Sequence, residues 1–161
     1  MLVNKILDLA INYFGKDTKL INHFLKVHSF ARHMAIMENC DPHTLEVVEI
    51  AAILHDIGIP ESIRKYNSGA GNWQEIEGPI IAEDLLKELN LEKNILERVL
   101  FIIGHHHTYS AIDGVDFQII AEADFLVNVF EGEIEKPECI KIKENIFKTT
   151  TGIRLLDQLY L

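Results

Sequence analysis

Apolar residues recur at helical spacing along almost the whole chain. One stripe in the first segment consists of Ile6, Leu9, Ala10, Tyr13 and Phe14. This three-to-four-residue period is typical of an amphipathic helix. The same period continues after Asp17 and again after Asp41. No segment alternates apolar and polar residues as a half-buried strand would, so the pattern predicts an all-α protein.

The expected helix ends carry recognisable residue types. Asp17 and Asp41 precede apolar runs as N-caps, Pro42 occupies a first helical position, and Gly58 closes the third helix. A polar loop at 67–72 follows. Further helices are expected over 74–89, 93–104, 115–130, 136–148 and 150–159. The pattern predicts a single helical bundle of about six to eight helices.

Length and composition favour one domain covering residues 1–161. The chain has 161 residues, of which 48% are apolar, as in compact globular proteins. The C-terminal helices, over 136–159, are expected to pack on the bundle or on a second copy in a homodimer. Cys40 and Cys139 lack disulfide spacing, and no apolar run is long enough for a membrane span. A cytoplasmic protein without membrane partners is expected.

The net charge restricts the partners. It is −10 at pH 7, which argues against a protein that binds nucleic acid polymers. An anionic substrate would therefore need a local positive centre, such as a metal ion or a few placed cations.

A His–Asp pair at the end of an apolar run is the first sign of such a centre. In "IAAILHDIGIP" (50–60), His55 and Asp56 follow residues that should be buried. Burying two ionisable groups is costly unless they have a partner. His28 and Asp124 also lie in apolar helical segments. Imidazole nitrogens and carboxylate oxygens suit Mn, Fe, Ni or Zn, and carboxylates also suit Mg.

The same residues carry a family resemblance. "HDIG" (55–58), with His28 upstream and Asp124 downstream, resembles the HD superfamily of metal-dependent phosphohydrolases over roughly residues 20–130. The segments "EGPIIAEDLL" and "EADFLV" agree with it. The resemblance implies an HD-type bundle whose metal is held by His28, His55, Asp56 and Asp124. It also implies hydrolysis of a phosphoester bond by a metal-activated water.

A second metal ion is less well supported by the sequence. Many members of the family hold one through two further histidines, one of them near the glycine that matches Gly78. This chain has Gln74 or Glu75 there. Candidate ligands for a second ion are His106, His107 and Glu77, but one ion is favoured over two. A complete di-iron site would instead favour an oxygenase.

Cations near the pair are candidates for substrate binding. Arg32 follows His28 by one turn, and Arg64 and Lys65 follow the pair in "IRKY". Arginine binds phosphate oxygens bidentately and lysine binds them as a point charge. The alternative is that these are solvated surface charges. The expected substrate is a small soluble phosphorylated compound, with a nucleotide favoured.

Asp56 and His55 are the predicted catalytic residues. Asp56 would ligate the metal and orient or deprotonate the attacking water, with Glu77 as a weaker candidate for proton transfer. The chain has neither a P-loop nor a GxSxG motif. The alternative function is a non-catalytic, metal-stabilised module that binds a nucleotide or a protein.

Overall fold

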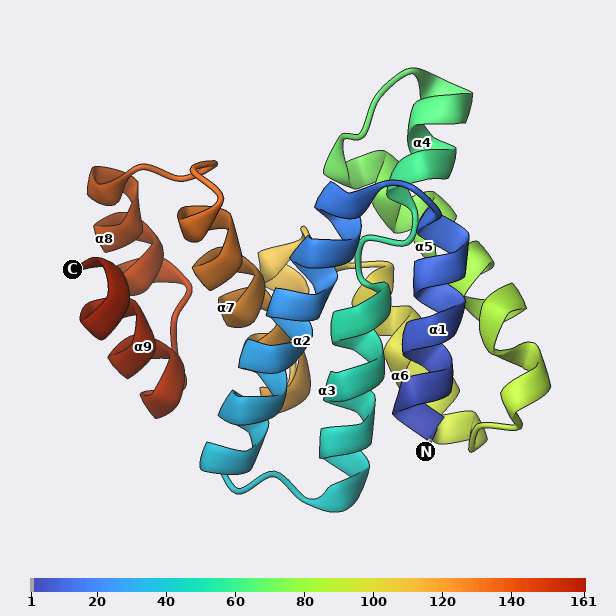
Figure 1. The fold of residues 1–161 in the computed structure, drawn as a ribbon. Coiled ribbons are helices and arrows are strands. Elements are labelled where there is room, and N and C mark those ends of the chain that lie inside the picture. Colours follow the sequence, from blue (N-terminus) through green and yellow to red (C-terminus); the bar gives the residue numbers. More distant parts are fainter. Residues whose placement is uncertain (1) are drawn as a thin grey trace.

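The computed structural model describes residues 2–161, whose regular secondary structure is entirely helical (Figure 1). Met1, the first residue of the predicted single domain, lies outside the described residues. The α-helices are α1 (Leu2–Phe14), α2 (Thr18–Met37), α3 (Pro42–Leu54), α4 (Ile59–Tyr66), α5 (Gly71–Leu86), α6 (Lys93–Ile103), α7 (Val115–Phe130), α8 (Lys136–Asn145) and α9 (Thr150–Tyr160). Short 3₁₀ turns cover Lys87–Leu89 and Tyr109–Ala111. Residues 2–161 contain no strand, so the predicted all-α class is confirmed.

Both predicted N-caps are confirmed. The Asp17 side chain accepts a hydrogen bond from the backbone N–H of Leu20, and that of Asp41 accepts one from Thr44. Each bond satisfies an N–H group that the first helical turn leaves free. The third helix ends at Leu54 rather than at Gly58, because the chain turns over residues 55–58.

Helix α3 occupies the centre of the bundle. It packs against α1, α2, α6 and α7, and Figure 1 shows α2 and α3 side by side. Every residue from Ile50 to Leu54 is 0% exposed. Full burial of each Ile or Leu side chain contributes about 1.5–3 kcal/mol. Because the last turn of α3 is buried on all sides, its C-terminal end places His55 and Asp56 in the interior.

A short helix follows the His–Asp pair, in a segment for which the sequence pattern predicted no helix. This helix, α4, projects from the bundle together with the loop that leads to α5 (Figure 1). Gly58 allows the chain to pass close to α5 at this point. A Cβ atom on Gly58 would lie 2.7 Å from the carbonyl oxygen of Gln74 and 2.8 Å from the backbone nitrogen of Gly78.

The C-terminal helices are attached to α7 through a buried carboxylate. Glu122 accepts hydrogen bonds from the backbone N–H groups of Lys148 (2.6 Å) and Thr149 (3.0 Å). The Tyr160 hydroxyl donates to the carbonyl of Leu126 at 2.8 Å. Helix α9 therefore packs against α7, and α8 packs against α9, at one side of the bundle (Figure 1).

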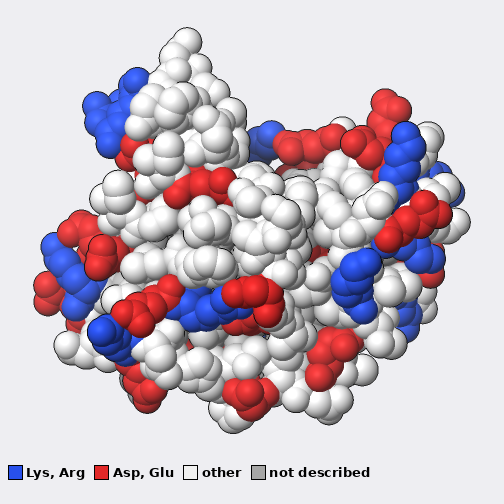
Figure 2. Space-filling view, turned by 180° about the vertical axis from the view of Figure 1, so that it is seen from behind, with Lys and Arg blue, Asp and Glu red and all other residues white. Residues whose placement is uncertain are grey.

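The charged surface is mixed on the face that Figure 2 shows. Acidic and basic side chains lie there in small groups that uncharged surface separates, and this face carries no continuous basic area. Within residues 2–161, no helix combines the length and the apolar character that crossing a membrane requires.

Candidate metal centre

Side chains from four parts of the chain converge beside the buried end of α3. They are His23 on α2, His55 and Asp56 in the turn after α3, His106 and His107 in the turn after α6, and Asp124 on α7. Packing of α2 and α7 against α3 brings these residues together.

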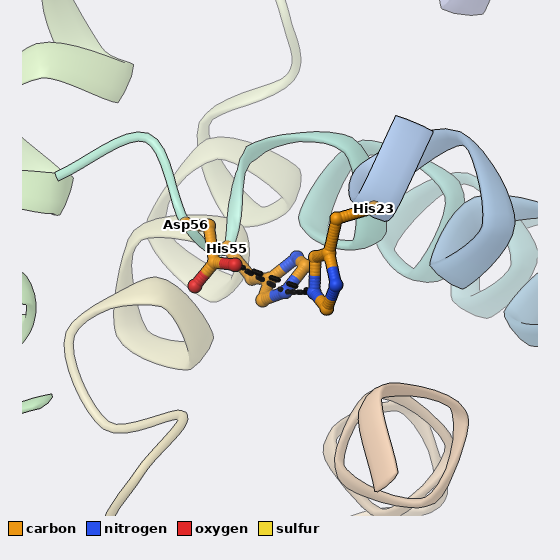
Figure 3. Close-up of side chains that lie close together, drawn as sticks. All are labelled: His23, His55 and Asp56. Atoms are coloured by element: carbon orange, nitrogen blue, oxygen red, sulfur yellow. Dashed lines mark hydrogen bonds and ion pairs between the residues drawn. The ribbon is translucent and has the colours of Figure 1, made fainter. Parts of the chain in front are cut away.

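A first donor group is formed by His23, His55 and Asp56 (Figure 3). The Nε2 atoms of the two histidines lie 3.3 Å apart, and each is 3.3 Å from Oδ2 of Asp56. Oδ1 of Asp124 lies 3.1 Å from Nε2 of His23 and 3.6 Å from Nε2 of His55. Two nitrogens and two carboxylates therefore face one point, a donor set that suits a divalent transition metal.

A second donor group shares Asp56 with the first. It consists of Asp56, His106 and His107, whose ligand atoms all lie within 4.8 Å of one another. Nε2 of His106 lies 3.5 Å from Oδ1 of Asp56, so the two oxygens of this carboxylate face different histidines. Nε2 of His106 is buried and makes no hydrogen bond with the described residues. An unpaired buried polar atom costs about 1–3 kcal/mol, and a cation is a partner that would satisfy it.

The ring orientations keep three Nε2 atoms directed at the cluster. Nδ1 of His55 lies 2.9 Å from the carbonyl of Ala52, and Nδ1 of His106 lies 2.8 Å from that of Ile103. Because a carbonyl only accepts, Nδ1 must carry the hydrogen in both rings, which leaves Nε2 free to bind a metal. Nδ1 of His23 faces a carboxylate instead, at 2.9 Å from Oε2 of Glu131.

The carboxylates of the cluster are held in their ionised form. Burial by itself raises the pKa of Asp56, but His55 and His106 outweigh it and hold that pKa well below its usual value. Burial also raises the pKa of Asp124, but hydrogen bonds with His23 and His55 outweigh burial and lower it. Ionised oxygens are the form that binds a cation.

The pKa values of His55 and His107 are shifted in opposite directions. Burial lowers the pKa of His55, but Asp56 and Asp124 outweigh burial and hold it well above its ordinary value. Burial and the neighbouring His106 lower the pKa of His107 to about 4. His107 is therefore neutral at pH 7 and able to act as a ligand.

A cavity of about 390 Å³ opens beside the cluster. His23, Asp56, His107 and Asp124 reach it, and Leu20, Ile59 and Ile63 form an apolar part of its wall. Its size lies within the range of small-molecule sites, about 300–1,000 Å³. The remaining charged residues of the lining are Asp17, Lys19, Glu131 and Glu133.

The structure does not bring the expected His28 to the cluster. Nε2 of His28 lies 3.2 Å from Oε1 of Glu49, and His23 occupies the place expected for His28. The two histidines are five positions apart on α2. Five residues rotate the side chain by roughly 140° around a helix, so both cannot face the same point.

The expected ligand Glu77 also lies outside the cluster. Its oxygens accept hydrogen bonds from Nζ of Lys65 at 2.7 Å and the Tyr66 hydroxyl at 2.8 Å, both on α4. The residue of α5 that reaches the cluster is Gln74, whose Oε1 lies 3.1 Å from Nε2 of His107. Two side chains of α4 therefore bind the carboxylate of Glu77, which is not part of the cluster.

None of the three expected substrate-binding cations lines the cavity. Nε of Arg32 lies 3.1 Å from Oε1 of Glu49. Arg64 donates two hydrogen bonds to Glu61, at 2.7 and 2.6 Å. Lys65 is bound by Glu77 as described. All three cations are paired with carboxylates at other surfaces.

Lys19 was not among the predicted site residues. It is the single Lys or Arg among the described residues that line the cavity. Its Nζ lies 3.2 Å from Oε1 of Glu133, and its side chain is largely exposed. The predicted residues that the structure does bring together are His55, Asp56, His106, His107 and Asp124. His23 joins them without having been predicted.

The fold and this cluster define a helical bundle with a buried His/Asp centre. The chain matches the HD domain family over residues 20–147. This match covers most of its length, and the chain therefore belongs to the HD domain family, as its "HDIG" segment predicted. Members of that family are generally metal-dependent phosphohydrolases.

A solved structure shares the fold. The crystal structure of a predicted HD superfamily hydrolase from an uncultured Thermotogales bacterium superposes with a TM-score of 0.73 and 24% sequence identity. The match covers 98% of this chain and 84% of that one. At this identity the likeness shows the fold alone. No curated protein gives a significant match.

Proposed function

We propose that this protein is a metal-dependent phosphohydrolase that cleaves a phosphoester bond in a small phosphorylated compound. The observation that carries the proposal is the position of Asp56. Its two oxygens face two different histidine groups, and the same side chain reaches the cavity. Membership of the HD domain family supports the same reaction class.

The donor groups fit divalent ions. His23, His55, Asp56 and Asp124 would hold a first ion, and Asp56, His106 and His107 would hold a second. The sequence alone favours one ion, whereas the shared Asp56 and the unpaired His106 support two. With several nitrogen ligands, Mn, Fe, Ni or Zn is preferred over Mg. A bound divalent ion supplies Lewis-acid polarisation of a phosphoryl oxygen and lowers the pKa of water.

The side chains of the cluster then divide the remaining work. Asp56 and Asp124 reach the cavity, where ionised oxygens accept hydrogen bonds from water and orient it. A carboxylate with so low a pKa is a weak proton acceptor, so we assign Asp56 to ligation and to orienting the water. His55 is completely buried and does not line the cavity. We therefore assign His55 to ligation and not to contact with the substrate.

The lining favours a substrate with few phosphate groups. Among the described residues, the lining has three carboxylates outside the donor groups, Asp17, Glu131 and Glu133, and one Lys or Arg, which is Lys19. Extra phosphates would meet these carboxylates, while one phosphate could bind at the ions. The apolar wall formed by Leu20, Ile59 and Ile63 offers packing for a base or sugar. Nucleoside monophosphates are therefore our first candidates.

The test is turnover by the full chain. Protein stripped with chelator is assayed with and without Mn²⁺ on p-nitrophenyl phosphate, its bis ester and the nucleoside monophosphates. We expect Mn²⁺-dependent release of phosphate from the monoesters, or of p-nitrophenol from the bis ester, that falls on the order of 100-fold or more in Asp56→Asn. Nucleotide binding by the Mn²⁺-loaded protein without hydrolysis of any substrate would contradict the proposal and favour the binding module.

A further inference from the structure

We propose that Glu131 is a positioning residue that fixes His23 as a metal ligand, with Lys26 holding Glu131 in place. This inference rests on the proposed metal site. Oε2 of Glu131 lies 2.9 Å from Nδ1 of His23, and Oε1 accepts from Nζ of Lys26 at 2.6 Å. The carboxylate is thereby bound at both oxygens.

The group that faces Nδ1 of His23 differs from the groups that face Nδ1 of His55 and His106. His55 and His106 are each oriented by a backbone carbonyl of their own helical segment. A carbonyl is neutral and is fixed by the main chain. His23 faces an ionised side chain from another helix, and a carboxylate acceptor raises the basicity of the opposite ring nitrogen more strongly. Of these three histidines, His23 is therefore the one whose affinity for a metal depends on a side chain that mutation can remove.

Helix α7 supplies both the ligand Asp124 and this support. Glu131 caps the C-terminal end of α7, two turns beyond Asp124. Its side chain is only 12% exposed, so the contact with His23 is shielded from water. Lys26 approaches from α2, where its Nζ also lies 4.8 Å from the ring centroid of Phe130. The group links α2 and α7 directly behind the metal site.

Two substitutions at Glu131 separate charge from hydrogen bonding. In Glu131→Gln the side chain keeps its shape but has one oxygen, for which Lys26 and His23 compete. If Lys26 takes the oxygen, the amide N–H faces His23 and favours the tautomer with hydrogen on Nε2, which cannot bind a metal. Glu131→Ala removes the acceptor completely. Both variants are therefore expected to bind metal more weakly than the wild type.

Glu133 provides a matched control. It is a second carboxylate of the same cavity and pairs with Lys19, and within residues 2–161 it makes no hydrogen bond or ion pair with a histidine. Glu133→Gln and Glu133→Ala remove the same charge from the cavity. A difference between the two positions therefore measures the contact with His23 and not the general field of the cavity.

The experiment is titration of the chelator-stripped full chain with Mn²⁺ by calorimetry, with a Co²⁺ absorption spectrum and thermal unfolding of the metal-free protein alongside. We expect affinity to fall by about 10- to 100-fold in each of the two Glu131 variants. The Co²⁺ spectrum should shift in both Glu131 variants. The Glu133 variants should keep the spectrum and remain within about 3-fold of the wild-type affinity, and all variants should unfold near the wild-type temperature.

Two results would overturn the inference in distinguishable ways. Equal losses at Glu131 and Glu133, with an unchanged Co²⁺ spectrum, would leave the metal site standing and remove the role of Glu131. Wild-type protein that binds neither Mn²⁺ nor Co²⁺ would remove the metal site itself, and the role of Glu131 with it.

Discussion

Nε2 of His23 and Oδ1 of Asp124 lie 3.1 Å apart although 101 positions separate the two residues in the chain. One belongs to α2 and the other to α7, and these helices pack against each other. The pair therefore exists only when the bundle is folded. A metal held between them would also stabilise the fold, because binding to the folded state alone shifts the folding equilibrium.

Replacing His23 and His28 one at a time separates the proposed metal ligand on α2 from a histidine of the same helix that lies outside the cluster. We expect His23→Ala to weaken Mn²⁺ binding on the order of 100-fold or more, because it removes a nitrogen that faces His55 and Asp56. His28→Ala should keep the wild-type affinity, since His28 contacts Glu49. Calorimetric titration of both variants checks this. Loss of binding in His28→Ala with retention in His23→Ala would reverse the assignment.

The number of bound ions tests the second donor group. We expect two Mn²⁺ ions per chain in the wild type and one in His106→Ala, because His106 belongs only to the second group. The stoichiometry of the titration measures both. One ion per chain in both proteins would show that the first group acts alone and would contradict the two-ion site.

The close approach of Gly58, in the "HDIG" segment, to the backbone of α5 leads to a prediction about stability. A Cβ at Gly58 would lie 2.7 Å from the backbone of Gln74, and backbone atoms cannot move aside cheaply. We expect Gly58→Ala to lower the free energy of unfolding by about 2–4 kcal/mol.

Gly69→Ala is the control for this substitution. The nearest atom to a Cβ at Gly69 lies 3.8 Å away, an ordinary contact. This variant should stay within about 0.5 kcal/mol of the wild type. Urea unfolding of the three metal-free proteins measures the difference, and equal stability of both variants would argue against the clash.

The ion pairs of Arg98 with Asp113 and Asp116 predict that part of the free energy of unfolding depends on pH. Arg98 on α6 donates to Asp116 at 2.6 and 2.7 Å and to Asp113 at 2.7 and 3.1 Å. These bonds join α6 to the start of α7. We expect Arg98→Met to lower the free energy of unfolding at pH 7 by about 1–2 kcal/mol.

The sign of the pH effect follows from Asp113. The hydrogen bond with Arg98 holds the pKa of Asp113 below its ordinary value of 3.8. Stability from a lowered pKa is present above that value and is lost as the pH falls through the folded-state pKa. The difference between wild type and Arg98→Met should therefore shrink below about pH 4. Urea unfolding at pH 7 and pH 3 measures it; a constant difference would contradict the assignment.

A surface pair on the same helix serves as the reference. Lys93 is 87% exposed and lies 3.5 Å from Glu97. Lys93→Met should change stability by less than about 0.5 kcal/mol at either pH.

Local signals in the sequence were sufficient for the helices and for part of the site. The caps at Asp17 and Asp41 depend only on residues within one turn. The His55–Asp56 pair ends a run of five completely buried residues, a pattern that is visible in the sequence. These features needed no knowledge of how the helices pack.

The choice between His23 and His28 required the packing. The inward face of α2 consists of Phe24, Val27, Ala31, Met34 and Ala35. At about 100° per residue, His23 and His28 lie roughly 70° on either side of the centre of this face. Both positions are equally compatible with the period. Which edge faces the end of α3 is decided by the arrangement of the helices and not by the residues of α2.

Two of the expected phosphate-binding cations, Arg64 and Lys65, lie away from the cavity for a related reason. Without α4 in the prediction, Arg64 and Lys65 belonged to a free loop. In the helix, Arg64 lies three positions after Glu61 and pairs with it, as residues at that spacing do. Lys65 reaches Glu77 on α5 instead of the cavity.

The central claim is that His55 and Asp56 hold metal, and elemental analysis tests it most directly. The full chain is purified without chelator, supplied with Mn²⁺ or Fe²⁺, and compared with the His55→Ala plus Asp56→Ala double variant. The structure predicts bound transition metal in the wild type and none in the variant, because Asp56 belongs to both donor groups. Wild-type protein that contains no metal after either ion is supplied would contradict the metal centre and the hydrolase built on it.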